Sequence, residues 1–229
     1  VGPLRRGLAD AGWLTLSMAS AGGREANDAR IRAGLEWLAQ RLEPDGGKPF
    51  LVLGGSGHGA AATAAWLAGN RDSEPAVGAL VAVNTLVRSG DEGEAVLRAF
   101  QAIEIPVLDI YGDAGRREVV TSADERTRRA RAGGNDAYRQ DRIQGLVDFR
   151  RDPATLNTRV AGWLGTAREE AAARARAAER RRAQREAAGK EPVEESPEEE
   201  GEGQQRPDDL ERYFTPPGGN GDEGEGGGQ

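Results

Sequence analysis

The chain has 229 residues, of which 37% are hydrophobic and 30% charged, and its mean hydropathy is −0.65. This composition is too polar for a chain packed throughout, so we expect one good-sized domain with unpacked segments attached to it. There is no cysteine and a single histidine, which excludes disulfides, thiol catalysis, cysteine-based metal sites and any cage of several histidines. No apolar run approaches the roughly 20 residues of a membrane-spanning helix, so the sequence predicts a soluble chain without a transmembrane segment.

The net charge of −7 comes from the carboxyl-terminal part of the chain. Residues 191–229 hold 13 acidic and 2 basic side chains, residues 167–190 hold 8 basic and 4 acidic ones, and residues 1–166 are neutral overall. We therefore expect a domain over 1–166, a helical extension rich in Ala, Arg and Glu over 167–190, and a disordered acidic tail rich in Gly, Glu and Pro over 191–229.

Short apolar runs and longer amphipathic stretches alternate from residue 13 to residue 164, which predicts an α/β fold with a parallel sheet and flanking helices. In chain order, we expect strands at Trp13–Met18, Phe50–Leu53, Leu80–Val83, Val107–Tyr111 and Tyr138–Ile143. We expect helices around Ile31–Leu42 and at Ala60–Ala68, Glu94–Ala102, Ser122–Ala132 and Pro153–Leu164. The fourth of these helices is almost wholly polar and should therefore be exposed.

A glycine-rich turn, residues 54–59, stands between a predicted strand and a predicted helix. A phosphate-binding P-loop would need Lys and then Ser or Thr after the last glycine, and Ala60 and Ala61 exclude it. The spacing of Gly55, Gly57 and Ala60 matches the motif of a dinucleotide-binding turn. The acidic residue that should follow the next strand is absent, so this alternative is weak, and we expect no cofactor or metal site.

The same turn fits the frame of a nucleophile elbow, Gly-x-Ser-x-Gly, in which a strained turn projects a nucleophile above the sheet. The segment reads Gly55, Ser56, Gly57, His58, Gly59, so both outer glycines are in place. The central residue is Gly57, which carries no nucleophile. The pattern therefore indicates a degenerate elbow.

Five segments together carry a family resemblance, which spans about residues 3–164. They are the chain start from Pro3 to Met18, the elbow, Ile105–Gly112, Tyr138–Gln140 and Val160–Leu164. They resemble a bacterial alpha/beta-hydrolase-like family known as domain of unknown function family 3530. The resemblance implies an alpha/beta-hydrolase fold and, because members look like exported proteins, a periplasmic or cell-envelope location. It also leads us to expect that the domain, which here begins at Val1, lacks its amino-terminal strands and the oxyanion loop.

The resemblance also assigns the three positions of a catalytic triad. The serine position falls on Gly57, the acid position falls on Gly115, with Asp113 two residues earlier, and the histidine position falls on Asp148. All three positions thus depart from the family pattern, which favours a catalytically degenerate protein used for binding or assembly.

Four residues remain as weaker catalytic candidates. Ser56 could act as a displaced nucleophile, with His58, Asp113 or Asp148 as partners. Neighbouring residues on a tight turn point in different directions, so a turn hydroxyl for Ser56 and a polar first-turn residue for His58 are the plainer interpretations, and both aspartates fit loop acids. Asp109, inside its strand, should anchor a neighbouring loop or charge.

Three functions therefore stay open. The first is a degenerate hydrolase-fold protein that binds an unknown protein or a small acyl or ester-like ligand. The second is a serine hydrolase that uses a displaced Ser56. The third is an interaction protein that works through its charged carboxyl-terminal extension, for which no nucleic-acid partner is expected because the acidic tail would repel one.

Overall fold

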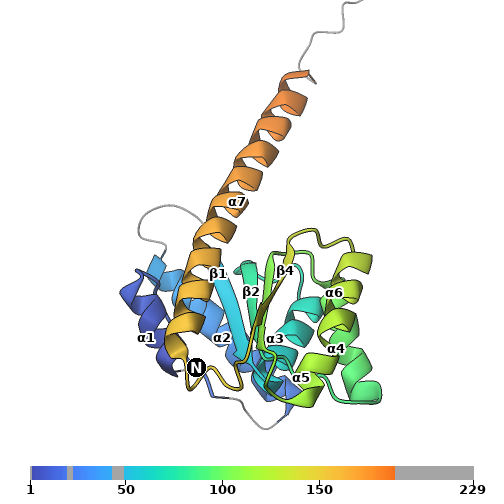
Figure 1. The fold of residues 1–229 in the computed structure, drawn as a ribbon. Coiled ribbons are helices and arrows are strands. Elements are labelled where there is room, and N and C mark those ends of the chain that lie inside the picture. Colours follow the sequence, from blue (N-terminus) through green and yellow to red (C-terminus); the bar gives the residue numbers. More distant parts are fainter. Residues whose placement is uncertain (1, 20–22, 43–48, 189–229) are drawn as a thin grey trace, which may run out of the picture. The chain divides into compact units, whose positions relative to one another are not determined.

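The computed structural model describes residues 2–19, 23–42 and 49–188 (Figure 1). The chain divides into two compact units, residues 1–186 and 187–229, and the whole sheet belongs to the first. The disordered tail predicted over 191–229 lies outside the described residues. Within the described part, no helix has the length and apolar character needed to cross a membrane.

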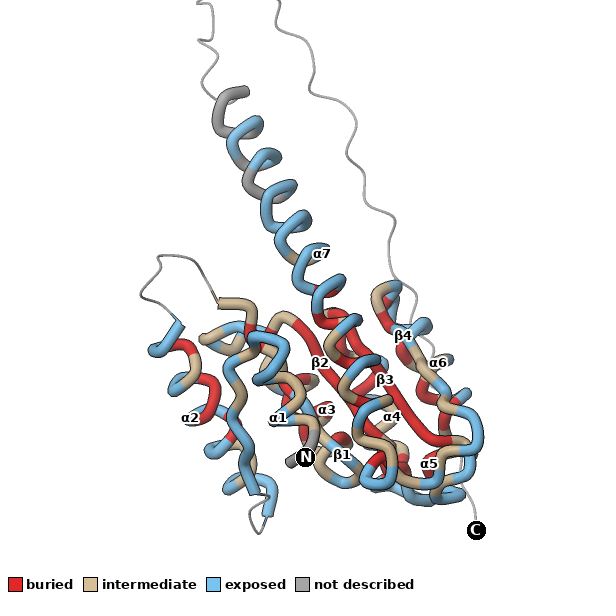
Figure 2. The backbone as a smooth tube through the Cα atoms, turned by 60° about the vertical axis from the view of Figure 1, so that its left-hand side comes forward, coloured by how far each residue is buried: buried red, intermediate tan, exposed pale blue. Residues whose placement is uncertain are grey.

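Four parallel strands form one sheet, and their order in space is their order in the chain. They are β1 (Leu51–Ser56), β2 (Val77–Val83), β3 (Val107–Gly112) and β4 (Tyr138–Ile143). The inner strands β2 and β3 are apolar apart from Asp109 in β3, and they are buried along almost their whole length (Figure 2), as strands covered on both faces require. Four of the five strands expected from the sequence are thereby confirmed.

Helices cover both faces of this sheet. On one face, apolar residues of α2 (Arg24–Leu42), α3 (His58–Gly69), α4 (Asp91–Ala102) and α6 (Ala123–Ala132) pack with alternate residues of the strands. On the other face, α1 (Gly2–Asp10) and α7 (Pro153–Ala188) pack against the remaining strand residues. The short α5 (Arg117–Thr121) closes a small cluster after β3. The alternation of side chains along each strand thus divides the core into two layers.

The last helix begins at a well-formed amino-terminal cap. Asp152 accepts hydrogen bonds from the Thr155 N–H at 3.1 Å and from the Thr155 hydroxyl at 2.6 Å, and Pro153 takes the first helical position, where its missing N–H costs nothing. The described side chains from Arg168 onward are exposed, apart from the half-buried Ala171. The helical extension expected after residue 166 is therefore confirmed as far as residue 188, as a continuation of α7.

The expectation of a strand at Trp13–Met18 is wrong. This segment is extended but forms no strand, because within the described residues no strand lies beside it to supply hydrogen bonds. Helix α1 was not expected either, since a short helix with two leucines as its only large apolar residues resembles a loop in composition.

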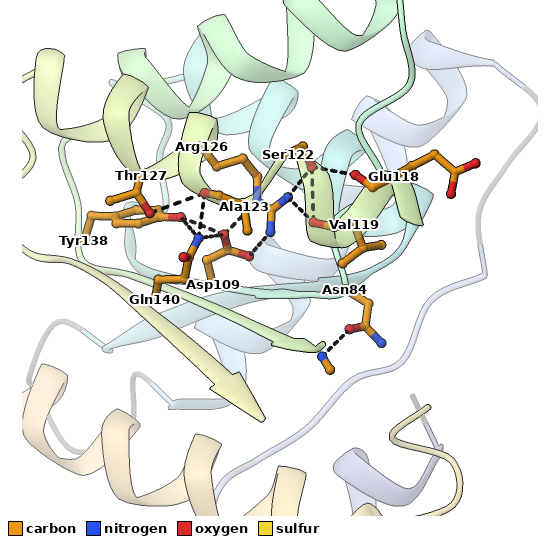
Figure 3. A network of polar contacts seen from close by, with 11 residues as sticks. Asn84, Asp109, Glu118, Val119, Ser122, Ala123, Arg126, Thr127, Tyr138 and Gln140 are labelled. Atoms are coloured by element: carbon orange, nitrogen blue, oxygen red, sulfur yellow. Dashed lines mark hydrogen bonds and ion pairs between the residues drawn. The ribbon is translucent and has the colours of Figure 1, made fainter. Parts of the chain in front are cut away.

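The polar helix at 122–132 was expected to be exposed, and this is wrong for Ala123, Arg126 and Ala130, which are buried. Arg126 is completely buried. Its Nε donates to Asp109 on β3 at 2.7 Å, and a terminal nitrogen donates to the Val119 carbonyl at 3.1 Å (Figure 3). Tyr138 and Gln140 on β4 also donate to Asp109, at 2.6 and 3.1 Å. Asp109 therefore anchors a neighbouring charge, as expected, and ties α6 to β3 and β4.

Burial and the nearby Asp109 carboxylate raise the pKa of Tyr138. The phenol therefore stays protonated and remains a hydrogen-bond donor to Asp109. The same carboxylate raises the pKa of Arg126, although burial alone would lower it. Arg126 therefore stays charged at neutral pH, and each partner of the buried pair depends on the other.

We predict that Arg126→Met will lower the free energy of unfolding by about 3–5 kcal/mol, because it leaves the Asp109 carboxylate buried without its cation. Arg128→Ala on the same helix is the matched control, since Arg128 is 74% exposed and its loss should cost less than about 1 kcal/mol. Urea denaturation measures both values. Equal losses in the two variants would contradict a structural role for the buried pair.

Candidate functional site

The turn between β1 and α3 is held in a left-handed backbone conformation at Gly57, with φ 59° and ψ −119°. The Gly57 N–H donates to the Val83 carbonyl at 2.9 Å, and the Gly57 carbonyl accepts from the Leu86 N–H at 3.3 Å. Both bonds attach the turn to the end of β2 and the residues that follow it. A residue with a side chain would be strained at this φ, which glycine adopts readily.

The tightness of the turn is set at Gly55. A Cβ at this position would lie 2.4 Å from the Gly59 oxygen and 2.6 Å from the Ala60 nitrogen, both backbone atoms. By contrast, a Cβ at Gly57 would meet the Leu86 side chain at 3.6 Å, an ordinary contact, and a Cβ at Gly59 would meet nothing within 4 Å. Space alone therefore demands glycine at position 55, and backbone strain favours it at position 57.

These features make the turn a nucleophile elbow in its backbone. A strand ends, the chain reverses within one residue of positive φ, and a helix starts at once. The residue at the point of the turn is the one with no side chain. Gly57 therefore brings no side-chain atom to the point of the turn.

A cleft of about 560 Å³ lies beside β1. Its walls are mainly apolar and come from α1, segment 13–17, α2, β1 and α7. Four polar side chains at or after the carboxyl ends of strands also line it: Ser56, Asn84, Asp148 and Arg150. We call these four residues the polar mouth of the cleft.

The structure separates the neighbours of Gly57. Ser56 is exposed and faces the cleft. His58 is exposed on the first turn of α3, where its Nε2 lies 3.4 Å from a terminal nitrogen of Arg88, and it does not line the cleft. The chain's single histidine is therefore not brought together with Ser56 in the cleft.

Both candidate aspartates are held by arginines. Asp113, just after β3, accepts two bonds from Arg142 at 3.0 and 2.9 Å and one from the Gly145 N–H at 2.6 Å. These bonds lower its pKa. Asp148 accepts from the side chain and the N–H of Arg150 at 2.7 and 2.8 Å, and these bonds likewise lower its pKa. Carboxylates stabilised in this way are poor proton acceptors.

The acid and histidine positions implied by the resemblance do lie close together. A Cβ at Gly115 would be 3.1 Å from the Val147 carbonyl oxygen, next to Asp148 in the chain. The Ala114 N–H also donates to the Leu146 carbonyl at 3.2 Å. The loops after β3 and β4 are thus joined by their backbones, while neither position holds the residue that a triad needs.

Two polar residues, one at the cleft and one in the core, were missed in the sequence. Asn84, with φ 47°, accepts a hydrogen bond from the Gly112 N–H at 3.1 Å and so pins the ends of β2 and β3 together (Figure 3). Arg126 was not singled out because it is one of several arginines in a polar helix. The signal that could have found it is Asp109, because a carboxylate in a buried strand requires a cation or several donors.

Within residues 2–19, 23–42 and 49–188 there is no group of three or more His, Cys, Asp or Glu side chains that could hold a metal ion. The polar groups of the mouth are instead one hydroxyl, one amide and one carboxylate paired with an arginine. This set suits hydrogen bonding to a polar ligand group more than metal coordination.

We predict that Gly55→Ala will destabilise the fold by about 3 kcal/mol, because its Cβ would collide with backbone atoms that cannot move without moving α3. Gly59→Ala is the matched control. The open space around Gly59 and its place in a helix should make that change neutral or stabilising by up to about 1 kcal/mol. Thermal or urea unfolding separates the two, and a tolerated Gly55→Ala would show that the turn is looser than described.

We also predict that Arg142→Gln will raise the pKa of Asp113 toward the ordinary value of about 3.9. Because the folded-state pKa is depressed in the parent chain, the stabilisation that Asp113 contributes is present above its unfolded-state pKa and lost as the pH falls through its folded-state pKa. The stability difference between parent and variant should therefore be largest near neutral pH and shrink below about pH 4. A carboxyl NMR titration that gives Asp113 the same pKa in both proteins would contradict this.

The family model described as "Protein of unknown function (DUF3530)" matches residues 19–166. A search of curated protein sequences gave no significant match.

Several solved structures have a similar fold. A monoacylglycerol lipase from Paleococcus ferrophilus is 15% identical with a TM-score of 0.52, over 72% of this chain and 88% of that one. An uncharacterised protein from Bacillus cereus is 12% identical with a TM-score of 0.53, over 70% and 53%. The Pyrococcus furiosus esterase Pf2001 is 16% identical with a TM-score of 0.51, over 72% and 75%. At such low identity the similarity concerns the fold, which is that of the alpha/beta hydrolases, and the chain belongs to the DUF3530 family.

Proposed function

We propose that this chain is an alpha/beta-hydrolase-fold protein without hydrolase activity, and that it acts in binding or assembly. The observation that carries the proposal is Gly57. Its backbone has the strained conformation of an elbow residue, with φ 59° and two hydrogen bonds to the end of β2 and the residues after it. A nucleophile at that point must be a side chain, and glycine has none.

The rest of a triad is missing as well. The acid position is Gly115, and the histidine position is Asp148, which forms an ion pair with Arg150 at 2.6 Å. Nucleophilic hydrolysis needs a nucleophile, a base within hydrogen-bond reach of it and a group that orients the base. Since fold alone confers no activity, the esterase and lipase names of the similar structures carry no weight against these substitutions.

A displaced Ser56 is the alternative that has some structural support, because Ser56 is exposed in the cleft and Asp148 lines the same cleft. The hydrogen bonds from Arg150 lower the pKa of Asp148, which weakens it as a base for a serine hydroxyl. His58, the other candidate base, is next to Arg88 and outside the cleft. Ser56 is therefore left without a good partner.

The polar mouth is the part of the cleft best suited to a ligand. In open α/β sheets, ligands bind in crevices outside the carboxyl ends of the strands, and the mouth lies there. The Arg150 guanidinium is 86% exposed even though it is paired with Asp148. We therefore propose that the mouth binds the polar group of a small acyl or ester-like ligand or of a partner protein.

The proposal predicts that a fluorophosphonate serine probe will leave the intact mass of the folded chain unchanged. Ser56→Ala and an active serine hydrolase, treated side by side, serve as controls. We expect the chain and the variant to give no adduct while the hydrolase is labelled fully. An adduct that disappears in Ser56→Ala would mean that a displaced serine works and that the protein is an enzyme.

A further inference from the structure

A second depression, of about 470 Å³, lies beyond the carboxyl ends of β2 and β3. The loop 87–89, which follows β2, forms one side of it. Helix α5, which follows β3, forms the other side together with Ser122. The depression shares no lining residue with the cleft. In open α/β sheets, ligands bind in crevices outside the carboxyl ends of the strands, so this depression is placed to receive one.

The lining of the depression is polar, in contrast to the apolar walls of the cleft. Val87 is its one apolar residue, and the others are Arg88, Ser89, Arg117, Glu118, Thr121 and Ser122. Two of the hydroxyls already donate to the backbone: Thr121 to the Arg117 carbonyl at 2.9 Å and Ser122 to the Glu118 carbonyl at 2.6 Å. The groups left to meet a ligand are therefore two guanidiniums, the Ser89 hydroxyl and the Glu118 carboxylate.

Both guanidiniums have hydrogen-bond donors to spare. Arg117 is exposed and forms no ion pair with any residue that the structure describes. Arg88 is 59% exposed, and one of its terminal nitrogens lies 3.5 Å from Glu92, clearly longer than the about 2.8 Å of a close guanidinium–carboxylate bond. Its other terminal nitrogen lies 3.4 Å from Nε2 of His58. These two contacts leave most of the Arg88 N–H groups available.

His58 supports Arg88 from the side of α3. A guanidinium is always protonated and can only donate, so a hydrogen bond between the two side chains requires Nε2 of His58 to accept. Glu92, on α4, holds the same guanidinium by its charge. His58 is also the single histidine of the chain. A ligand that contacts or moves the Arg88 guanidinium therefore changes the surroundings of one imidazole whose signals overlap with no other.

The donor set matches a phosphate group. The planar fork of a guanidinium binds two oxygens of a phosphate or a carboxylate at once. A carboxylate has its two oxygens in one plane, whereas a phosphate has oxygens directed to several sides and can meet donors from two elements. Here the donors do come from two elements, Arg88 and Ser89 from the loop after β2 and Arg117 from α5. The two arginines also outweigh the single Glu118 in charge.

We propose that this depression binds the phosphate group of a small phosphorylated ligand. Arg88 and Arg117 are its two main contacts, and Ser89 adds a hydroxyl donor; we call these three residues the anion site. Glu92 competes with the phosphate for Arg88 and so weakens its binding. Because the anion site has no residue in common with the cleft, it works whether or not the polar mouth binds a ligand.

An NMR titration of the chain with inorganic phosphate tests the proposal. Sodium phosphate replaces sodium chloride at constant pH and ionic strength, and the signals of the His58 imidazole and of the amides of 87–89 are followed. We expect shifts that saturate, and an affinity at least ~10-fold lower in Arg88→Gln and in Arg117→Gln. Arg98→Gln is the matched control, since Arg98 is exposed on α4 and does not line the depression. Shifts that do not saturate, or an Arg88→Gln variant that binds as tightly as the parent chain, would overturn the proposal.

Two further measurements test the contact with Arg88 and the identity of the anion. Glu92→Gln should raise the phosphate affinity about threefold, because Arg88 loses its competing carboxylate. Glu94→Gln on the same helix is its control, since Glu94 pairs with Arg129 instead, and it should leave the affinity unchanged. An unchanged affinity in Glu92→Gln would mean that Arg88 does not hold the anion. Sodium acetate should bind clearly more weakly than phosphate, and equal binding of the two would contradict a phosphate site.

Discussion

The backbone of Gly55 lies against the backbone of Gly59 and Ala60, and this contact places the start of α3 directly at the end of β1. No side chain larger than hydrogen fits between them. The hydrogen bonds of Gly57 then fasten the turn to β2, and Asn84 fastens β2 to the end of β3. The carboxyl edge of the sheet, where the mouth of the cleft lies, is thus aligned by a series of contacts that begins at one glycine.

Such a site can lose its chemistry without losing its shape. The turn, the joined loops after β3 and β4 and the cleft all depend on backbone bonds and apolar packing, whereas catalysis would depend on the side chains at positions 57, 115 and 148. The buried Asp109 and Arg126 pair lies on the other layer of the sheet and stabilises the fold without entering the cleft. The residues that stabilise the fold are therefore different from those at positions 57, 115 and 148, so changes at these three positions leave the fold intact.

The sequence predicted an element correctly where a short stretch of residues determines the structure by itself. Apolar runs such as Leu80–Val83 and the Gly55 turn predict β2 and the elbow, because burial on both faces and tight turns restrict composition directly. Arg126 was missed because its burial depends on Asp109, 17 residues away and on another element. Trp13–Met18 has the apolar composition of a strand but lacks a described strand beside it to pair with. At the candidate site, the sequence analysis singled out Gly57, Ser56 and Asp148. The arginines that pair with Asp113 and Asp148 could not be predicted, because these contacts depend on how the loops fold.

The surroundings of Gly57, and not the freedom of glycine alone, hold the turn in its elbow conformation. A crystal structure of the Gly57→Ser variant tests it most directly, since a Cβ at this position meets the Leu86 side chain only at 3.6 Å. We expect the introduced serine to keep the positive φ of the parent glycine, which is 59°. We also expect its backbone to keep the hydrogen bonds to the Val83 carbonyl and the Leu86 N–H. A turn that relaxes to negative φ, with those bonds broken, would contradict it and would reduce Gly57 to an ordinary loop glycine.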